Sequence, residues 1–425
     1  MFESYQQTEA FFDSRKSLGI KPGLDRIYSL LDLLGNPQTK IRAIHIAGTN
    51  GKGSTVQFIK NALQANGFRI GVFSSPSLTG LTGHVGIDDT FISEEVFLDL
   101  CNEIYPAIRQ LDNRNMSPTE FEIITALAFL FFSKTVDIAI IEAGMGGRED
   151  TTNCFTPALS IITNVAKDHT QFLGESLKEI AYHKAGIIKK HVPVILGEME
   201  LEALEVMETE IHDKKTKSYQ LGDSFTYKLA EKIAGTQQFS WRKDNELHML
   251  SVQILGEHQV KNASIAFMAL KLLSETGLKV NTNKSIEAIK STRVPGRFEI
   301  IQHNPIIVLD GAHNPAGIDT FLQTVTVNYN EKPKHLIFSA FKDKDLETML
   351  NKLSGYFETI TVTTFQHPRA ASAEDLYRLT QAETKRIATD FKTAIKQIDP
   401  SDGNYFITGS LNFIAQVREY LLSHN

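Results

Sequence analysis

Short, nearly continuous apolar runs alternate with helical patterns along most of this chain of 425 residues. Runs of this kind are typical of parallel strands buried on both faces, and their alternation with helices predicts a doubly wound α/β fold. The clearest predicted strands and helices of the N-terminal part are 41–48, 53–66, 69–75, 93–111, 119–133, 136–144, 159–165, 176–189 and 192–197.

The pattern changes twice further along the chain. Residues 216–254 show shorter strands with polar turns, which predict a small antiparallel addition, and a helix starts near His258. The segment 291–301, STRVPGRFEII, places Pro and Gly between two patterned regions, as domain boundaries often do. Beyond it the alternation of strands and helices restarts. We therefore expect a mostly parallel sheet domain over 1–294 and a smaller Rossmann-like α/β domain over 295–425.

Composition and charge exclude several classes of protein. The net charge of −6 and the pI of about 6.1 provide no basic field for nucleic acid. Two cysteines, Cys101 and Cys154, are too few for a disulfide framework and fit a reducing compartment. The N-terminus lacks the apolar run of a secretory signal, and the most apolar stretch, 123–132, is shorter than the roughly 20 residues of a membrane span. We expect a soluble cytoplasmic protein with no nucleic-acid or membrane partner.

The sharpest local feature is the loop Gly48-Thr-Asn-Gly-Lys-Gly-Ser54, between a predicted strand and a predicted helix. Glycines let a backbone wrap closely around phosphate oxygens, and the following helix points its N-terminal amides at them. Lys52 would contact the β- and γ-phosphates, and Ser54 or Thr55 would offer a hydroxyl near magnesium. A solvated glycine-rich turn is the alternative, which the strand–loop–helix context disfavours. The predicted nucleotide ligands in this loop are Thr49, Asn50, Gly51, Lys52, Gly53, Ser54 and Thr55.

Three downstream residues are candidates for the same site. Glu142 ends a predicted strand, where a carboxylate facing a phosphate loop can hold magnesium or simply cap a loop. His169 follows the end of another strand, although a lone histidine is more often a packed or surface residue. Lys184 lies on the helix predicted over 176–189, where sequence physics alone leaves open a surface position and a functional one.

The loop departs from the common phosphate-loop spacing because Gly53 stands between the lysine and the serine. This variant resembles the loop of the Mur ligase superfamily, and of its folylpolyglutamate and dihydrofolate synthase branch in particular. Further segments resemble the same family in order and spacing, namely S-P-T-E-F-E at 117–122, G-M-G-G-R at 144–148, H-K-A-G-I at 183–187 and D-G-A-H-N-P at 310–315. The resemblance implies an ATP-dependent ligase that joins L-glutamate to a folate.

The resemblance also implies roles for individual residues. Those acting in catalysis would be Lys52, a carbamylated Lys184 and His313. Further contacts to ATP would come from Asn262, Arg297 and Asp310. Two magnesium ions would be held by Ser54, Ser75, Glu142 and His169. The pterin end of the folate would meet Thr119, Phe121 and Asp150.

In the implied reaction the γ-phosphate of ATP passes to the folate carboxylate, and the glutamate amine attacks the resulting acyl phosphate. Closure of the two domains would exclude water. The alternatives are a dihydrofolate synthase, a bifunctional enzyme, another Mur-type ligase, which usually carries an additional N-terminal domain, and a P-loop nucleotide switch. The switch is disfavoured because no guanine-reading N-K-x-D segment is evident. We expect a monomer with small-molecule partners.

The chain departs from the family pattern at several positions. Glu149 and Thr151 stand where leucine and alanine are common, Ser77 where histidine is common, and Gly83-His84-Val85 where E-R-I is common. Loss of an arginine able to grip a carboxylate bidentately would alter substrate choice more than ATP binding. We therefore expect polyglutamylation of reduced folates, with dihydropteroate a weak substrate or none, unless the loop is exposed and the departures are neutral.

Overall fold

The computed structural model describes residues 1–77, 79–230 and 235–424. These residues divide into two compact units. The N-terminal unit contains Met1–Ala230, Gln238–Ser251 and Lys261–Thr292, and the C-terminal unit contains 235–237, Val252–Val260 and 293–424. Short segments of the chain thus enter the C-terminal unit well before residue 293.

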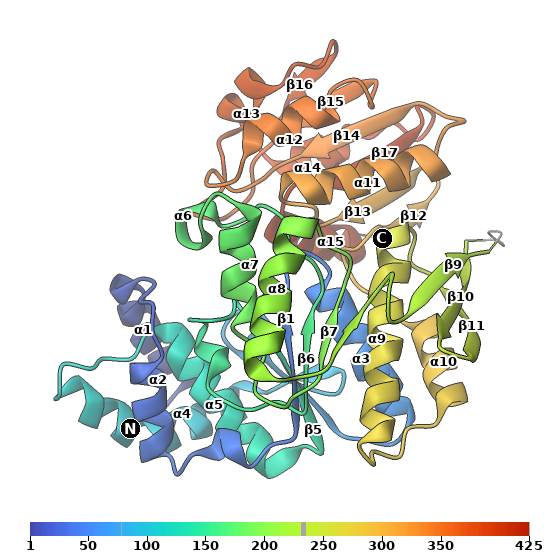
Figure 1. Cartoon of the computed structure of the whole chain (residues 1–425). Helices are drawn as coiled ribbons and strands as arrows, with labels where there is room; N and C mark the ends of the chain where they lie inside the picture. The colour runs from blue at the N-terminus through green and yellow to red at the C-terminus, as the bar shows by residue number, and fades with distance from the viewer. Residues whose placement is uncertain (78, 231–234, 425) are drawn as a thin grey trace. The chain divides into compact units, whose positions relative to one another are not determined.

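The core of the N-terminal unit is a mostly parallel sheet with the strand order β4-β3-β2-β5-β1-β6-β7-β8 (Figure 1). Strand β1 (Ala43–Ala47) pairs in parallel with β5 (Ile138–Glu142) on one side and with β6 (Leu159–Ile162) on the other. The strand order reverses across β1, so the carboxyl ends of these strands lie at the edge where doubly wound sheets bind ligands. The other strands are β2 (Ile70–Phe73), β3 (Val85–Ile87), β4 (Thr90–Phe91), β7 (Val194–Leu196) and β8 (Ser218–Gln220).

Helices cover both faces of this sheet, which explains why every residue of β1 and β5 is buried (Figure 1). Helix α5 is the apolar stretch expected to be a buried helix, and its residues from Glu122 to Leu130 are buried. Among the described residues, no helix is long and apolar enough to cross a membrane. The helices of this part of the chain are α1 (Tyr5–Arg15), α2 (Asp25–Leu33), α3 (Lys52–Ala65), α4 (Glu94–Asp112), α5 (Glu120–Thr135), α6 (Thr170–Leu173), α7 (Leu177–Ala185), α8 (Leu201–Lys214), α9 (Glu257–Glu275) and α10 (Thr282–Ser291), with short 3-10 turns at Lys16–Leu18, Pro37–Thr39, Thr82–His84 and Thr151–Asn153.

The small antiparallel addition begins later in the chain than predicted. Strand β8 pairs in parallel with β7 and therefore extends the main sheet. A separate sheet has the order β11-β10-β9, with β9 and β10 antiparallel. The sequence alone does not show whether β8 joins the main sheet or the separate one, because β8 is short and polar and its partner lies in another segment of the chain. The strands of the separate sheet are β9 (Thr226–Leu229), β10 (Gln237–Lys243) and β11 (Glu246–Val252).

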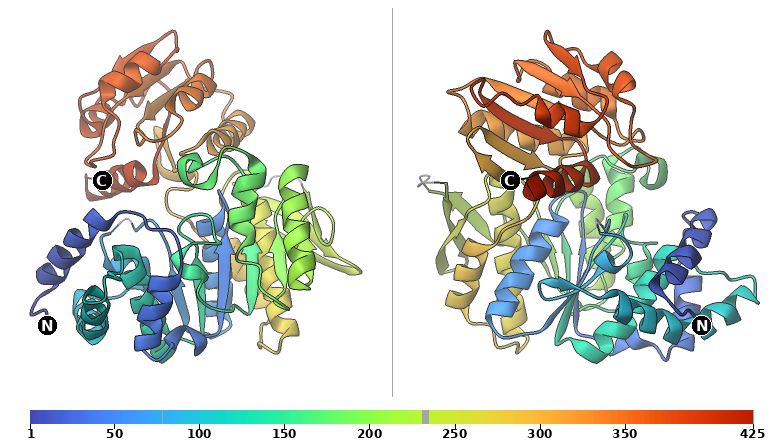
Figure 2. Two further views of the ribbon diagram at one scale, coloured as in Figure 1. Left: turned by 60° about the vertical axis from the view of Figure 1, so that its left-hand side comes forward. Right: turned by 180° about the vertical axis from the view of Figure 1, so that it is seen from behind.

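The C-terminal unit is built around a second sheet with the order β12-β13-β17-β14-β15-β16 (Figure 2). Its strands pair in parallel, except that β12 is antiparallel to β13. The elements are β12 (Glu299–His303), β13 (Ile306–Asp310), α11 (Pro315–Asn328), β14 (Lys334–Phe338), α12 (Leu346–Leu353), β15 (Thr359–Val362), α13 (Ala373–Leu379), β16 (Lys385–Ile387), α14 (Phe391–Lys396), β17 (Asn404–Thr408) and α15 (Leu411–His424). A doubly wound sheet followed by a smaller α/β sheet confirms the predicted fold class.

Candidate active site

The predicted phosphate loop connects β1 to α3. Gly51 is the N-cap of α3 and has a left-handed φ of 86°, which glycine adopts without strain. A side chain would also lack room there, because a Cβ at Gly51 would lie 2.4 Å from the Asn262 amide oxygen. Because Gly51 has no side chain, the N-cap residue itself makes no bond to the first amides of α3. The N-terminus of α3 therefore offers amides and a helix dipole to an anion.

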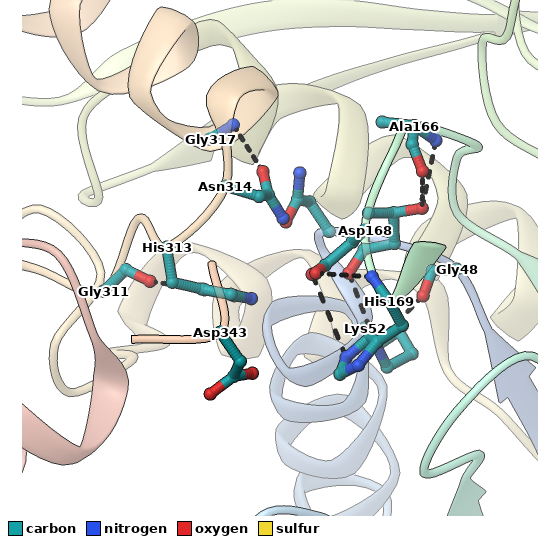
Figure 3. Close-up of polar contacts among 12 residues, drawn as sticks. Gly48, Lys52, Ala166, Asp168, His169, Gly311, His313, Asn314, Gly317 and Asp343 are labelled. Carbon is teal, nitrogen blue, oxygen red and sulfur yellow. Dashed lines mark hydrogen bonds and ion pairs between the residues drawn. The ribbon is translucent and has the colours of Figure 1, made fainter. Parts of the chain in front are cut away.

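The loop that follows β6 holds the phosphate loop in place. The Thr49 hydroxyl donates to the Ala166 carbonyl at 2.9 Å and accepts from the Ala166 amide at 3.0 Å (Figure 3). The Asn50 amide donates to the Asn164 side chain at 2.9 Å, and the Thr163 hydroxyl donates to the Asn50 carbonyl at 2.6 Å. Sequence reasoning missed Thr163 and Asn164, and the only signal was their place at the end of the strand predicted over 159–165.

Lys52 lies at the first turn of α3 beside Glu142. Its ammonium donates to the Gly48 carbonyl at 2.9 Å and the Thr49 carbonyl at 3.3 Å (Figure 3). The Glu142 carboxylate, at the carboxyl end of β5, is buried and lies 4.0 Å from the Lys52 ammonium. Ser54, on the same turn of α3, is also buried. The structure therefore brings Lys52, Glu142 and the phosphate loop together.

Two buried hydroxyls, on α3 and in the loop after β2, have no hydrogen-bond partner among the described residues. The Thr55 hydroxyl on α3 and the Ser75 hydroxyl after β2 make no hydrogen bond within the residues that the structure describes. Buried polar groups are normally paired, so such hydroxyls suit an oxygen-seeking ligand such as magnesium. In the same described ranges, no group of three or more His, Cys, Asp or Glu side chains is placed to hold a metal ion. The magnesium ligands Ser54, Ser75, Glu142 and His169 stay predictions.

His169 lies between β6 and α7 in a strained backbone conformation. Its φ of 51° is left-handed, which is uncommon for a residue other than glycine. The Asp168 carboxylate accepts the His169 amide at 2.8 Å (Figure 3). Strain of this kind clusters at binding sites, where the surrounding structure enforces it. Sequence reasoning named His169 but missed Asp168.

Lys184, on α7, is almost fully buried at 3% exposure. Burial, reinforced by the positive charge of Lys52, lowers the pKa of Lys184 from 10.5 to about 7, although Asp168 and Asp150 partly oppose this shift. Desolvation disfavours an ammonium, so near neutral pH a large fraction of the side chain is a neutral amine. The neutral amine is the nucleophilic form.

The predicted pterin-side residues lie at the start of α5 and at Asp150, the N-cap of the 3-10 turn Thr151–Asn153 that follows β5. Thr119 is the N-cap of α5 and forms a capping box with Glu122, which in turn pairs with Arg26 at 3.1 Å. The Asp150 carboxylate accepts the Met145 amide at 2.8 Å. The Phe121 ring packs 5.7 Å from the Phe73 ring. Thr119 and Asp150 thus have structural hydrogen bonds, and their contact to a substrate stays a prediction.

The loop that departs from the family pattern is partly packed inward. A Cβ at Gly83 would lie 2.4 Å from the Ser77 hydroxyl, so these two positions are matched in size. His84 lies 2.9 Å from the Ser74 carbonyl and 6.3 Å from the Phe121 ring, and burial lowers its pKa. Leu78, in the same loop, lies outside the described residues. The imidazole therefore packs beside a predicted pterin-side residue.

In the C-terminal unit, Asp310 ends β13 and organises the loops around it. Its carboxylate accepts the amides of Phe298 and Ala312, each at 2.9 Å. Burial raises the pKa of Asp310, and the neighbouring Arg297 opposes this shift. The His313 ring donates from Nδ1 to the Gly311 carbonyl, 2.8 Å away, so Nδ1 carries a proton (Figure 3). Asp310 is thus placed as the scaffold for Arg297 and His313.

The phosphate loop of the N-terminal unit and the loop after β13 occur together in one class of protein. Residues 46–270 match the family model described as Mur ligase middle domain, and residues 296–407 match Mur ligase, glutamate ligase domain. The chain belongs to the Mur ligase family, and within it to the folylpolyglutamate and dihydrofolate synthases. Both predicted resemblances are therefore confirmed.

The similar proteins cover almost the whole chain. Dihydrofolate synthase/folylpolyglutamate synthase of Bacillus subtilis is 36% identical, with 99% of this chain and 100% of the relative covered. Folylpolyglutamate synthase of Lacticaseibacillus casei is 31% identical over 99% of each chain. The solved Mycobacterium tuberculosis folylpolyglutamate synthase complexed with ADP and AMPPCP has a TM-score of 0.90 at 28% identity, with 98% of each chain covered.

Proposed function

We propose that this protein is an ATP-dependent ligase that adds L-glutamate to tetrahydrofolate or its polyglutamates through an acyl phosphate, giving ADP and phosphate. The observation that carries the proposal is the glycine N-cap of α3, with Lys52 on the first turn held beside the buried Glu142. The relatives named above, one of them complexed with ADP and AMPPCP, support the same reaction.

The phosphate loop binds the triphosphate and Lys52 neutralises charge on the transferring phosphoryl group. In the free protein the Lys52 ammonium is held by the carbonyls of Gly48 and Thr49. Because these partners belong to the loop itself, the ammonium is already directed at the place where phosphates bind. The γ-phosphorus bonds to a carboxylate oxygen of the folate as its bond to the bridging oxygen of ADP breaks.

Glu142, the hydroxyls of Ser54 and Ser75, and His169 would hold the magnesium that such phosphate transfer uses. Most of these donors are oxygens, which magnesium prefers, and the buried Ser75 hydroxyl lacks another partner among the described residues. Bound magnesium supplies positive charge that stabilises the phosphoryl group. The protein's own part is to hold these donors and the Lys52 ammonium in place.

We also propose that Lys184 is carbamylated. The neutral amine attacks the carbon of carbon dioxide, a carbon–nitrogen bond forms, and one proton leaves, so the side chain becomes an anion. The lowered pKa of Lys184, about 7, makes the attacking form abundant near neutral pH. The resulting carbamate would add an anionic oxygen donor beside Lys52.

Residues of the C-terminal unit serve the second half of the reaction. The Arg297 guanidinium stabilises phosphate oxygens, and Asp310 fixes the loop on which Arg297 lies by accepting the Phe298 amide. His313, whose Nδ1 donates to the Gly311 carbonyl, would orient the acyl phosphate. The glutamate amine then attacks the acyl carbon, the bond to phosphate breaks, and the amine loses a proton.

A bifunctional enzyme that also converts dihydropteroate is the second candidate, favoured by the double name of the Bacillus subtilis relative. The packed loop with Ser77, Gly83 and His84 favours the glutamate-tailed acceptor, because it lacks an arginine that could grip the benzoate carboxylate.

The test is kcat/KM for tetrahydrofolate and for dihydropteroate under identical ATP, magnesium and glutamate. We expect turnover with tetrahydrofolate and a much lower value with dihydropteroate. Comparable values would replace the first candidate by the bifunctional enzyme. Release of ADP that requires neither folate nor glutamate would overturn the ligase proposal itself.

A further inference from the structure

A buried histidine in the middle of β1 has no role in the proposed reaction. His45 is fully buried in a strand whose other residues are Ala and Ile. Its ring packs 5.0 Å from the Phe155 ring, and its Nε2 lies 2.9 Å from the Thr152 hydroxyl. An apolar residue would fill this position without burying a polar ring, so the hydrogen bond to Thr152 invites a functional explanation.

Thr152 connects His45 to Asp150. The Thr152 hydroxyl donates to Asp150 Oδ1 at 2.5 Å, and the Thr152 amide donates to the same oxygen at 3.0 Å. A hydroxyl has one proton, so the Thr152 oxygen must accept its hydrogen bond from His45. Burial lowers the pKa of His45 to about 3, so the ring is neutral and carries one proton. Because Nε2 donates to the Thr152 oxygen, this proton is on Nε2. The hydrogen bonds therefore run in one direction, with His45 donating to Thr152 and Thr152 donating to the Asp150 carboxylate.

These contacts decide which carboxylate oxygen of Asp150 remains for a ligand. A carboxylate has about four acceptor sites, and Thr152 occupies both sites on Oδ1. Oδ2 accepts the Met145 amide at 2.8 Å and retains further capacity. A Cβ built on Gly144 would lie 3.3 Å from Asp150 Oδ2 and 2.9 Å from the Phe121 ring. Oδ2 and the edge of Phe121 therefore border the same small space, which glycine keeps open.

We propose that His45 and Thr152 are positioning residues that lock the Asp150 carboxylate so that Oδ2 receives an N–H group of the pterin ring. The inference rests on the proposed function, since the ligand is the aminopyrimidinone ring of a folate. Neither residue touches the substrate. The hydrogen bonds from Thr152 to Oδ1 hold the Asp150 carboxylate in one orientation. This orientation fixes the direction in which Oδ2 can accept a hydrogen bond. Phe121 supplies the apolar surface beside it.

The experiment compares KM for tetrahydrofolate, KM for ATP and kcat in His45→Leu, His45→Gln and Thr152→Val. Leucine removes the donor, glutamine retains an amide donor of similar reach, and valine removes only the hydroxyl of Thr152. We expect His45→Leu and Thr152→Val each to raise KM for tetrahydrofolate about tenfold. KM for ATP and kcat should stay within about twofold, and His45→Gln should restore most of the loss.

A double variant tests whether the two residues act in one chain. Once the Thr152 hydroxyl is gone, the donor of His45 has nothing to orient, so His45→Leu/Thr152→Val should be no worse than Thr152→Val. Ser160→Ala is the matched control. Ser160 is the register partner of His45 in β6, is equally buried, and bonds the Ile187 carbonyl at 2.8 Å, outside this chain. Its loss should lower stability and leave KM for tetrahydrofolate unchanged.

The outcomes separate this inference from the function on which it rests. Wild-type protein that fails to turn over tetrahydrofolate would overturn the proposed function. Turnover by the wild type with an unchanged KM in Thr152→Val would overturn the inference alone. So would a KM in the double variant equal to the product of the two single effects, or an equal KM rise in Ser160→Ala. If His45→Leu does not fold, Thr152→Val and His45→Gln decide the matter.

Discussion

The loops that follow β1 and β13 have the same plan but use their polar groups differently. Each connects a parallel strand to a helix. At α3 the N-cap is Gly51, which has no side chain to bond the first amides of the helix. At α11 the N-cap is Asn314, whose side chain accepts the Gly317 amide at 2.8 Å, and Asp310 binds the amides of Phe298 and Ala312. In the first loop the backbone amides at the start of α3 are available to a ligand. In the second loop the amides of Gly317, Phe298 and Ala312 bond side chains of the same unit.

The largest effect that this comparison predicts is at Lys52. We expect Lys52→Ala to lower turnover about a thousandfold, because charge on the transferring phosphoryl group would lose its counterion. The free energy of unfolding should change little, since the ammonium donates to carbonyls of its own loop and its ion pair with Glu142 is long, at 4.0 Å. Turnover, circular dichroism and urea unfolding on the same preparation provide the test.

Lys60→Ala is the control for Lys52. Lys60 lies on the same helix and pairs with Asp89 at 2.6 Å, away from the loop. It should retain turnover. Near-normal turnover of Lys52→Ala would break the distinction between a ligand-binding loop and a structural one.

The next effect concerns Lys184. Lys184→Ala should lose about a hundredfold in kcat, because the carbamate that we propose would be absent. Acetate or formate should restore part of the activity by supplying a carboxylate to the vacated space. Wild-type protein in 13C-labelled bicarbonate should give a carbamate NMR signal that Lys184→Ala lacks.

Lys189 supplies the control for this rescue. It is also mostly buried, burial lowers its pKa, and it donates to the Asn153 carbonyl at 3.2 Å. Lys189→Ala should not respond to acetate. A carbamate signal that persists in Lys184→Ala would refute the assignment.

The second loop should respond in the opposite way, through stability. Asp310→Asn replaces an accepting oxygen by an amino group, so either the Phe298 or the Ala312 amide loses its partner. We expect the free energy of unfolding to fall by about 2 kcal/mol, as for a buried donor left unsatisfied. Urea unfolding measures this change. Unchanged stability together with lost turnover would mean that the second loop, like the first, acts on the reaction rather than on stability.

The last prediction is a pH signature of the N-terminal unit. Between about 7 and 10.5 the unfolded chain keeps a proton on Lys184 that the folded protein has lost. The free energy of unfolding should therefore rise with pH across this window in buffer free of carbon dioxide. Lys184→Met should remove that contribution, and equal pH slopes for both proteins would contradict the lowered pKa.

Much of the fold was predictable because its strands are buried on both faces. The apolar runs that became β1 and β5 have no other simple interpretation. The parallel pairing of β8 was not predictable, since a short polar edge strand has no distinctive pattern. In the site, the glycines and Lys52 stand out locally. The hydrogen-bond partners of Thr49 and Asn50 lie more than a hundred residues away in the chain, and no local pattern reveals them.

The C-terminal unit is assembled from separate stretches of chain, and this limits how it can be exchanged. Leu255 packs against its apolar core, and the Gln237 side chain donates to the carbonyls of Ile254 and Gly256. A Cβ at Gly256 would lie 2.8 Å from the Thr324 hydroxyl. A recombinant fragment that starts at Arg293 would leave this surface uncovered. Recombination between relatives therefore has to exchange residues 235–237 and 252–260 together with the C-terminal part, because one continuous segment does not contain the whole unit.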